Sequence, residues 1–175
     1  MAVGRSRLND SDGSACILMN VRRDEAVEIK DILDTRVIAV DLPGGTKAEA
    51  IDTLAQMLLD AGYITEIDGF EKDIYYRETL GQTGIGNYVA IPHGQSSCVV
   101  KNGIAVGKFT KEIPWESLDG NGVHVVFLFS VQAGENGGNE HLRMLAKLAG
   151  KLGNDRVIED LLAAQTVQEI VASFS

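Results

Sequence analysis

The stretch VHVVFLFSV, residues 123–131, is apolar at all but two of its positions. His124 and Ser130 are the exceptions, so an extended segment here would be apolar on both faces. Strands of this kind lie in sheets that are covered on both sides, because each face needs apolar neighbours. The stretch therefore predicts a central strand and, with it, a layered α/β domain.

More elements are predicted when the chain is followed from this strand toward the N-terminus. The runs at 103–109 (GIAVGKF) and 37–42 have the composition of strands. Between them, Thr46 and Glu49 form a capping-box pair ahead of an apolar stripe, and Gly62 marks the end of that helix. Strands and helices thus alternate, as an α/β fold requires.

A second helix is predicted to begin at Asp68, which is followed three residues later by Glu71. Its apolar stripe includes Phe70 and Ile74, and the next position on that stripe is Arg77. An arginine is more often a solvated surface residue. Its position on an apolar stripe nevertheless indicates that Arg77 borders a site.

The segment after the central strand, AGENGGN (133–139), is predicted to be a flexible loop of the kind that often carries function. A helix is predicted after it, and His141 falls in the first turn, where a histidine is often merely solvated. The residues of this helix that are predicted to face the core are Leu142, Leu145, Ala146 and Ala149. Two shorter helices are predicted to complete the chain.

Composition limits the classes of partner and compartment. The net charge of −9 disfavours nucleic acid or an anionic membrane as the main partner and is compatible with a basic protein. No apolar run approaches the ~20 residues of a membrane span, and the N-terminus lacks a secretory signal pattern, so a cytoplasmic protein is predicted. Cys16 and Cys98 are far apart, which favours reduced thiols over a disulfide framework or a zinc site.

The domain organisation is predicted from length and local composition. Residues 1–28 are polar, rich in small residues and aperiodic, so they are predicted to be a flexible leader. Residues 29–175 have a suitable length and pattern for a single domain.

The strongest candidate for chemistry is His93, in the motif AIPHG. Pro92 keeps the preceding residue extended, and Gly94 removes a side chain that would crowd an approaching group. The ring is expected at the end of a strand, on a sheet edge. A neutral imidazole there could attack phosphorus and form a phosphoramidate. A structural turn histidine is the alternative that the residues alone leave open.

Phosphoryl transfer depends on positioning and charge stabilisation, for which an arginine fork and hydrogen-bond donors are suited. Arg77 and His141 are the available candidates. His124 is expected to be structural. A zinc site built from the three histidines is a further alternative, although the close spacings of zinc motifs are missing. The glycines of TGIGN enter a strand, unlike those of nucleotide-binding loops, and no cofactor is predicted.

These motifs together resemble a known family. ETLGQTGIGNYVAIPHG is similar to the phosphorylation-site signature of enzyme IIA domains of the mannitol/fructose class, from the bacterial sugar phosphotransferase system. VVFLFSV, the glycine-rich segment and NEHLRMLAKLAGKL resemble its second characteristic segment. TKAEAIDTLAQMLLDAGYI and YYRETL resemble its first two helices. The resemblance covers roughly Ile29 to Phe174.

The resemblance implies a mixed, about five-stranded sheet with helices on both faces. It implies that His93 accepts a phosphoryl group from phospho-HPr, that Arg77 neutralises the group, and that His141 hydrogen-bonds it or the active histidine. Enzyme IIB would receive the group next, and a membrane enzyme IIC would use it on a sugar. No metal, nucleotide or nucleic acid is implied. A shallow apolar docking patch around His93 is expected, with Ile91 and Tyr88 near it.

Two points stay open at this level. Related domains serve a nitrogen-linked regulatory branch and act by phosphorylation-dependent protein binding, which is a second possible role. Tyr88 stands where the family commonly has a small residue, and it could reshape the rim of the site. Neither the sugar nor the oligomeric state is indicated by the sequence.

Overall fold

The computed structural model describes residues 28–175. They form a sheet of six strands in the order β1-β5-β6-β3-β2, with β4 also paired to β6. The strands are β1 (Ile38–Leu42), β2 (Gly84–Gly86), β3 (Val89–Ala90), β4 (His93–Ser96), β5 (Gly103–Ile113) and β6 (Val123–Gln132). This is the mixed α/β architecture that was predicted, with six strands in place of about five.

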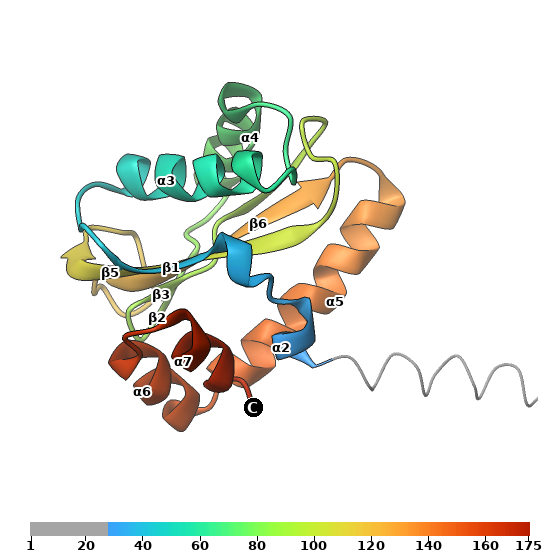
Figure 1. Ribbon diagram of the computed structural model, residues 1–175. Coiled ribbons are helices and arrows are strands. Elements are labelled where there is room, and N and C mark those ends of the chain that lie inside the picture. The colour runs from blue at the N-terminus through green and yellow to red at the C-terminus, as the bar shows by residue number, and fades with distance from the viewer. Residues whose placement is uncertain (1–27) are drawn as a thin grey trace, which may run out of the picture.

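Helices cover both faces of the sheet, as Figure 1 shows. Helices α3 (Lys47–Asp60) and α4 (Ile67–Thr79) lie on one face. On the other face lie α2 (Ile29–Ile32), α5 (Glu135–Leu152), α6 (Asp155–Ala163) and α7 (Val167–Ala172). A short 3-10 turn, η1 (Thr35–Val37), leads into β1. The sheet is therefore the middle layer of three.

Strand β6 occupies the centre, as its apolar sequence predicts. It pairs antiparallel with β5 on one side and parallel with β3 and β4 on the other. Successive side chains alternate between the two layers: Phe127 and Phe129 join the core under α5, whereas Leu128 joins the core under α3 and α4. All three are essentially inaccessible to solvent.

The first predicted capping box is present. The hydroxyl of Thr46 accepts from the main-chain N–H of Glu49, and the Glu49 carboxylate accepts from the N–H of Thr46. The predicted cap of the second helix is wrong by two residues, since the cap is Glu66 and not Asp68. Helix α4 begins at Ile67 after Glu66, which makes no side-chain cap, so the Asp68–Glu71 spacing is not a capping box.

Helix α5 begins earlier than predicted, and most of AGENGGN is helical. The glycines of this segment allow a close approach to the end of β6. A Cβ on Gly137 would lie 2.4 Å from the carbonyl oxygen of Gln132. The carbonyl of Gly137 also accepts from Asn102 Nδ2 at 3.1 Å. The tertiary contact thus overrides the poor helix propensity of glycine.

The buried face of α5 is also shifted from the prediction. Leu142, Ala146 and Ala149 are exposed, and Leu145 is partly buried. The residues of this helix that the core covers are His141, Met144, Leu148 and Leu152. They follow a helical spacing of three and four residues, one position away from the predicted stripe.

The predicted strand that ends at His93 is divided in two. Strand β3 stops at Ala90, and β4 begins at His93, so Ile91 and Pro92 form a break in one edge of the sheet. Both parts pair in parallel with β6. Among the described strands, β6 is the only partner of β4, so His93 lies on a sheet edge as predicted, but it opens a strand instead of ending one.

The predicted leader falls on residues 1–27, which lie outside the described residues, together with Glu28, which precedes α2. Within the described part of the chain, the helices are all too short or too polar to cross a membrane.

Candidate functional site

The orientation of His93 is set by a main-chain carbonyl two residues earlier. Nδ1 of the ring lies 2.8 Å from the carbonyl oxygen of Ile91. A carbonyl oxygen only accepts hydrogen bonds, so Nδ1 carries the proton. The other nitrogen, Nε2, keeps its lone pair, so it is the ring nitrogen that could act as a nucleophile.

The surroundings of His93 keep the ring neutral. Burial lowers the pKa of this partly buried imidazole below its ordinary value, and the nearby Arg77 cation lowers it further. The hydrogen bond to Ile91 and the Glu78 carboxylate act in the opposite direction without reversing the shift. The lone pair on Nε2 is therefore available at neutral pH.

Arg77 comes from the last turn of α4 and reaches the nucleophilic nitrogen directly. Its Nε donates to Nε2 of His93 at 3.1 Å, and its Nη1 donates to the carbonyl of Gly81 at 3.0 Å. The cation thus lies where negative charge would arrive on His93. Arg77, which interrupts the apolar stripe of α4, thus lines the hollow beside His93.

His141, from α5, completes the group. Its ring centroid lies 5.1 Å from that of His93, and its edge packs against Phe129. The side chain is only 8% exposed, and its Nδ1 has no hydrogen-bond partner among the described residues. Burial, followed by the charges of His93 and Arg77, lowers the pKa of His141 to about 4. The expectation of a merely solvated first-turn histidine does not apply.

Gly94 is required by the packing of α4. A Cβ at this position would lie 2.9 Å from the main-chain oxygen of Asp73 and 3.1 Å from the nitrogen of Ile74. The absent side chain therefore allows the helix that carries Arg77 to approach the strand that carries His93. The sequence reasoning had assigned this space to an incoming group.

Two hollows meet at His93. One, of about 390 Å³, lies toward α4 and is bordered by Tyr76, Arg77 and Leu80. The other, of about 770 Å³, lies toward the first half of α5 and is bordered by Leu142. Both are lined by His93 and His141, so the two rings form a shared wall.

Apolar side chains are exposed around these hollows. Tyr76 and Leu80 are each 66% exposed, and Leu142 is 60% exposed. An apolar patch is therefore present, but it consists of these three residues and not of Ile91 and Tyr88. Ile91 packs partly into the core instead.

Tyr88 lies away from His93, so the expected effect on the rim of the site is wrong. Tyr88 and Asn87 have positive φ values of 62° and 53° and form the tight turn between β2 and β3. The tyrosine ring packs at 5.5 Å from that of His124, and both line a separate hollow. His124 therefore does not join the other two histidines.

Gln95 is a site residue that the sequence analysis missed. It is exposed, borders both hollows, and donates to the carbonyl of Gly134 at 3.4 Å. Alternation along a strand places residues two apart on one face, so Gln95 shares the face of His93. The spacing of two residues between His93 and Gln95 is therefore the feature of the sequence that could have identified Gln95.

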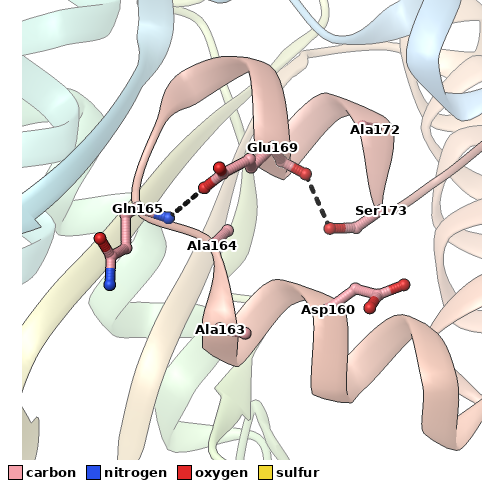
Figure 2. A pocket seen from close by; sticks show the side chains of 7 residues that line it. All are labelled: Asp160, Ala163, Ala164, Gln165, Glu169, Ala172 and Ser173. Carbon is pink, nitrogen blue, oxygen red and sulfur yellow. Dashed lines mark hydrogen bonds between the residues drawn. The ribbon is translucent and has the colours of Figure 1, made fainter.

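A further hollow, of about 380 Å³, lies between α6 and α7 (Figure 2). Its Glu169 carboxylate is already used, since it accepts from the main-chain N–H groups of Gln165 and Thr166. The hydroxyl of Ser173 likewise donates to the carbonyl of Glu169. The remaining lining is mostly alanine, so this hollow offers little chemistry.

Histidine, cysteine and acidic side chains are the groups that could hold a metal ion. Over the range that the structure describes, no group of three or more histidine, cysteine or acidic side chains is arranged to hold a metal ion. The cluster of Arg77, His93 and His141 instead combines a neutral nucleophilic nitrogen, a cation and a second buried imidazole. Such a cluster is suited to hold an anionic group on His93.

Comparison with known proteins adds an independent line of evidence. Residues 31–175 match the family model described as "Phosphoenolpyruvate-dependent sugar phosphotransferase system, EIIA 2". The match includes all three residues of the cluster.

Curated relatives agree with the family model. The chain is 30% identical over 145 residues to the fructose-specific EIIABC component of Bacillus subtilis, covering 83% of this chain and 22% of that protein. It is 34% identical over 144 residues to the mannitol-specific enzyme IIA component of Halalkalibacterium halodurans, covering 81% and 92%. The chain thus spans about a fifth of the first relative and nearly all of the second.

Solved structures share the fold. The nitrogen regulatory protein IIA-Ntr of Neisseria meningitidis superposes with a TM-score of 0.69 at 27% identity, covering 84% of this chain and 99% of that one. Enzyme IIA mannitol of Escherichia coli, solved in complex with phosphorylated enzyme IIB, superposes with a TM-score of 0.69 at 23% identity, covering 81% and 96%.

Proposed function

This chain belongs to the EIIA 2 family of the phosphoenolpyruvate-dependent sugar phosphotransferase system, and we propose that it carries a phosphoryl group on Nε2 of His93. The group comes from phospho-HPr and passes to an enzyme IIB of the fructose/mannitol class. A membrane enzyme IIC then uses it in sugar uptake. Phosphoryl transfer to and from His93 takes place in the cytoplasm and requires no metal ion or nucleotide.

The observation that carries this proposal is the pair of hydrogen bonds on the His93 ring. Nδ1 is held by Ile91, and Nε2 faces Arg77 at 3.1 Å. One nitrogen is thus protonated and fixed, and the other is unprotonated and next to a cation. A phosphoryl acceptor needs both properties.

The transfer step balances without any other reactant. The lone pair of His93 Nε2 attacks phosphorus in line, and the bond from phosphorus to the histidine nitrogen of HPr breaks, so that this nitrogen leaves with the electron pair. Arg77 releases Nε2 and turns its donors to the phosphoryl oxygens. The proton stays on Nδ1 throughout and remains hydrogen-bonded to the carbonyl oxygen of Ile91. Passage to enzyme IIB repeats the step with His93 as the leaving group.

Partner docking is supported by the exposed apolar patch of Tyr76, Leu80 and Leu142, which surrounds His93. A small patch of this kind suits a partner that must bind and leave quickly. The net charge of −9 favours a basic partner. The Escherichia coli enzyme IIA solved with phosphorylated enzyme IIB supports the choice of acceptor.

The test is phosphorylation of the purified chain with phosphoenolpyruvate, enzyme I and HPr. We expect one acid-labile, base-stable phosphate per chain, which is lost in His93→Ala. His124→Ala is the matched control, since its ring lies in a different hollow, and it should be phosphorylated normally. Arg77→Ala and His141→Ala should fold but slow transfer by roughly 100-fold. Phosphate that persisted in His93→Ala would contradict the proposal.

A second function is favoured by the likeness to the nitrogen regulatory protein, which covers nearly the whole of that chain at 27% identity. In that case the phosphorylated and unphosphorylated forms would bind a regulatory protein with different affinity. The two functions differ in a direct assay. Rapid transfer from phospho-His93 to a fructose- or mannitol-class enzyme IIB indicates transport, whereas a stable phosphate that such an enzyme IIB does not remove indicates regulation.

A further inference from the structure

Thr83 lies in the connection between α4 and β2 and is 2% exposed. Its hydroxyl makes two hydrogen bonds with opposite roles. It accepts from Nε1 of Trp115 at 3.2 Å and donates to Oε1 of Glu78 at 2.5 Å. Because Trp115 can only donate, the proton of the Thr83 hydroxyl is directed to Glu78.

Glu78 is the neighbour of Arg77 in α4, and its side chain is only 7% exposed. Its second oxygen, Oε2, lies 2.5 Å from Nζ of Lys47 but outside hydrogen-bond geometry, so this contact is an ion pair. A buried carboxylate needs such partners to remain charged without a large penalty. The end of α4 is therefore tied to α3 through Lys47 and to the following connection through Thr83.

The hydrogen bond between Thr83 and Glu78 also affects the position of Arg77, through the connection between α4 and β2. The residues between Glu78 and Thr83 close a short loop, and the carbonyl of Gly81 within it accepts from Nη1 of Arg77. The contact between Glu78 and Thr83 fixes both ends of that loop. It thereby fixes the carbonyl that holds one branch of the guanidinium while Nε reaches His93.

The same residue reaches His93 by a second route. The main-chain carbonyl of Thr83 accepts from the N–H of Ile91 at 2.9 Å, and the carbonyl of Ile91 holds Nδ1 of His93. Thr83 thus connects to the cation through its side chain and to the nucleophile through its backbone.

We propose that Thr83, oriented by Trp115 and bonded to the Glu78–Lys47 pair, is the positioning residue that sets Arg77 against Nε2 of His93. It touches neither the phosphoryl group nor the reacting nitrogen, and its hydroxyl acts through Arg77. The part of this inference that concerns transfer rests on the proposed function.

The test compares Thr83→Val with the wild type in two measurements. Valine leaves Glu78 Oε1 without its donor, so the loop and Arg77 lose their fixed position. We expect phosphoryl transfer from HPr to slow by roughly tenfold or more. In NMR of the unphosphorylated protein, we expect the Nε–H proton of Arg77 to exchange with water roughly tenfold faster, because its bond to His93 is weakened.

Thr83→Ser keeps the hydroxyl and should have the wild-type rates of phosphoryl transfer and of Arg77 proton exchange. A general loss of stability would not explain this difference between valine and serine. Glu116→Gln is the control, since the Glu116 side chain pairs with the same Lys47 but is 72% exposed. It should change neither value. If Thr83→Val does not fold, Trp115→Phe removes the donor to the hydroxyl while it keeps an aromatic ring beside Lys47, and faster Arg77 exchange in that variant supports the inference.

Unchanged Arg77 exchange in a folded Thr83→Val or Trp115→Phe protein would overturn the positioning role. A wild-type chain that takes no phosphate from HPr would instead contradict the proposed function. The NMR measurement does not depend on phosphorylation, so the two failures are distinguishable.

Discussion

One nitrogen atom of His141 differs from those of His93 in having unused hydrogen-bonding capacity. Nδ1 of His141 is buried and has no hydrogen-bond partner within residues 28–175, although such atoms normally have one. The ring lies beside the atom that would carry the phosphoryl group. The arrival of that group would provide oxygen acceptors and about two negative charges in the same hollow. His141 is thus suited to respond to phosphorylation.

The resulting prediction concerns the titration of His141. In the unphosphorylated protein its pKa is about 4, because burial and the nearby cation disfavour the charged ring. An anionic neighbour favours the charged form, so phosphorylation of His93 should raise the pKa by about one unit or more. NMR titration of the His141 ring protons measures both states. A midpoint near the ordinary histidine value in the free protein, or no rise on phosphorylation, would contradict this assignment.

At the residue scale, the sequence predicted His93, Arg77 and His141 as site residues, and the structure brings the three side chains together, but the sequence did not indicate which nitrogen of His93 would react. The choice of Nε2 depends on the carbonyl of Ile91, which can reach the ring only because the chain breaks between β3 and β4. The residue types around His93 do not indicate that the strand breaks at this point or where the Ile91 carbonyl lies. The position of Gln95 beside His93 was missed, although the spacing of two residues was visible in the sequence.

At the scale of elements, the contact between α4 and β4 brings the cation to the nucleophile. Gly94 is a tight point of that contact, because a Cβ there would lie 2.9 Å from the main-chain oxygen of Asp73. A clash with main-chain atoms cannot be relieved by a change of rotamer, as a clash with the end of a side chain can. The distance between Arg77 and His93 is therefore sensitive to this one position.

Gly94→Ala is predicted to reduce both stability and transfer. Moving α4 outward should cost about 1–3 kcal/mol in the free energy of unfolding, as overpacked cores do. Urea denaturation measures this cost. Gly150→Ala in α5 is the matched control, because a Cβ there meets nothing within 4 Å. That control should be neutral or more stable by up to about 1 kcal/mol. Equal stability of the two variants would be evidence against a tight α4–β4 contact.

The largest error at the element scale was the start and the buried face of α5. Three glycines and two asparagines predict a loop by propensity. Their actual role depends on the end of β6, where Gly137 lies against Gln132 and Asn102 bonds its carbonyl. Because helix α5 was expected to begin later, His141 was placed at its start, whereas it lies in the interior and is buried.

At the scale of the whole molecule, the exposed apolar residues divide into those near His93 and those elsewhere. Leu142 borders the hollow at His93, whereas Leu118 is 72% exposed and lines neither hollow there. Exposed leucines are common on protein surfaces, so exposure alone does not identify an interface. Position relative to the reactive nitrogen distinguishes the two.

Leu142→Asp is therefore predicted to weaken docking of HPr and enzyme IIB. The substitution should raise the apparent KM for phospho-HPr by roughly tenfold, since a central apolar anchor is lost. Stability should change by less than about 1 kcal/mol, because the side chain is exposed. Leu118→Asp is the matched control and should leave KM unchanged. An equal effect of both variants would show that the apolar patch at His93 has no special part in docking.

The layered fold could be read from the sequence because β6 is apolar on both faces and the helices have clear apolar stripes. The resemblance implied about five strands, and the six of the structure include the two-residue β3, which the break at Ile91 and Pro92 separates from β4. Strands of that length are defined by their partners in the sheet and have no signal of their own. The boundary of the predicted leader at residue 28 stays a prediction.

The central claim is that Nε2 of His93 receives the phosphoryl group. Long-range proton–nitrogen NMR of the protein labelled with ¹⁵N and phosphorylated by enzyme I and HPr tests it most directly. We predict that Nε2 of His93 alone acquires the shift of a phosphorylated nitrogen, while Nδ1 keeps its proton. Phosphate on Nδ1, or on His141 or any other residue, would contradict the account.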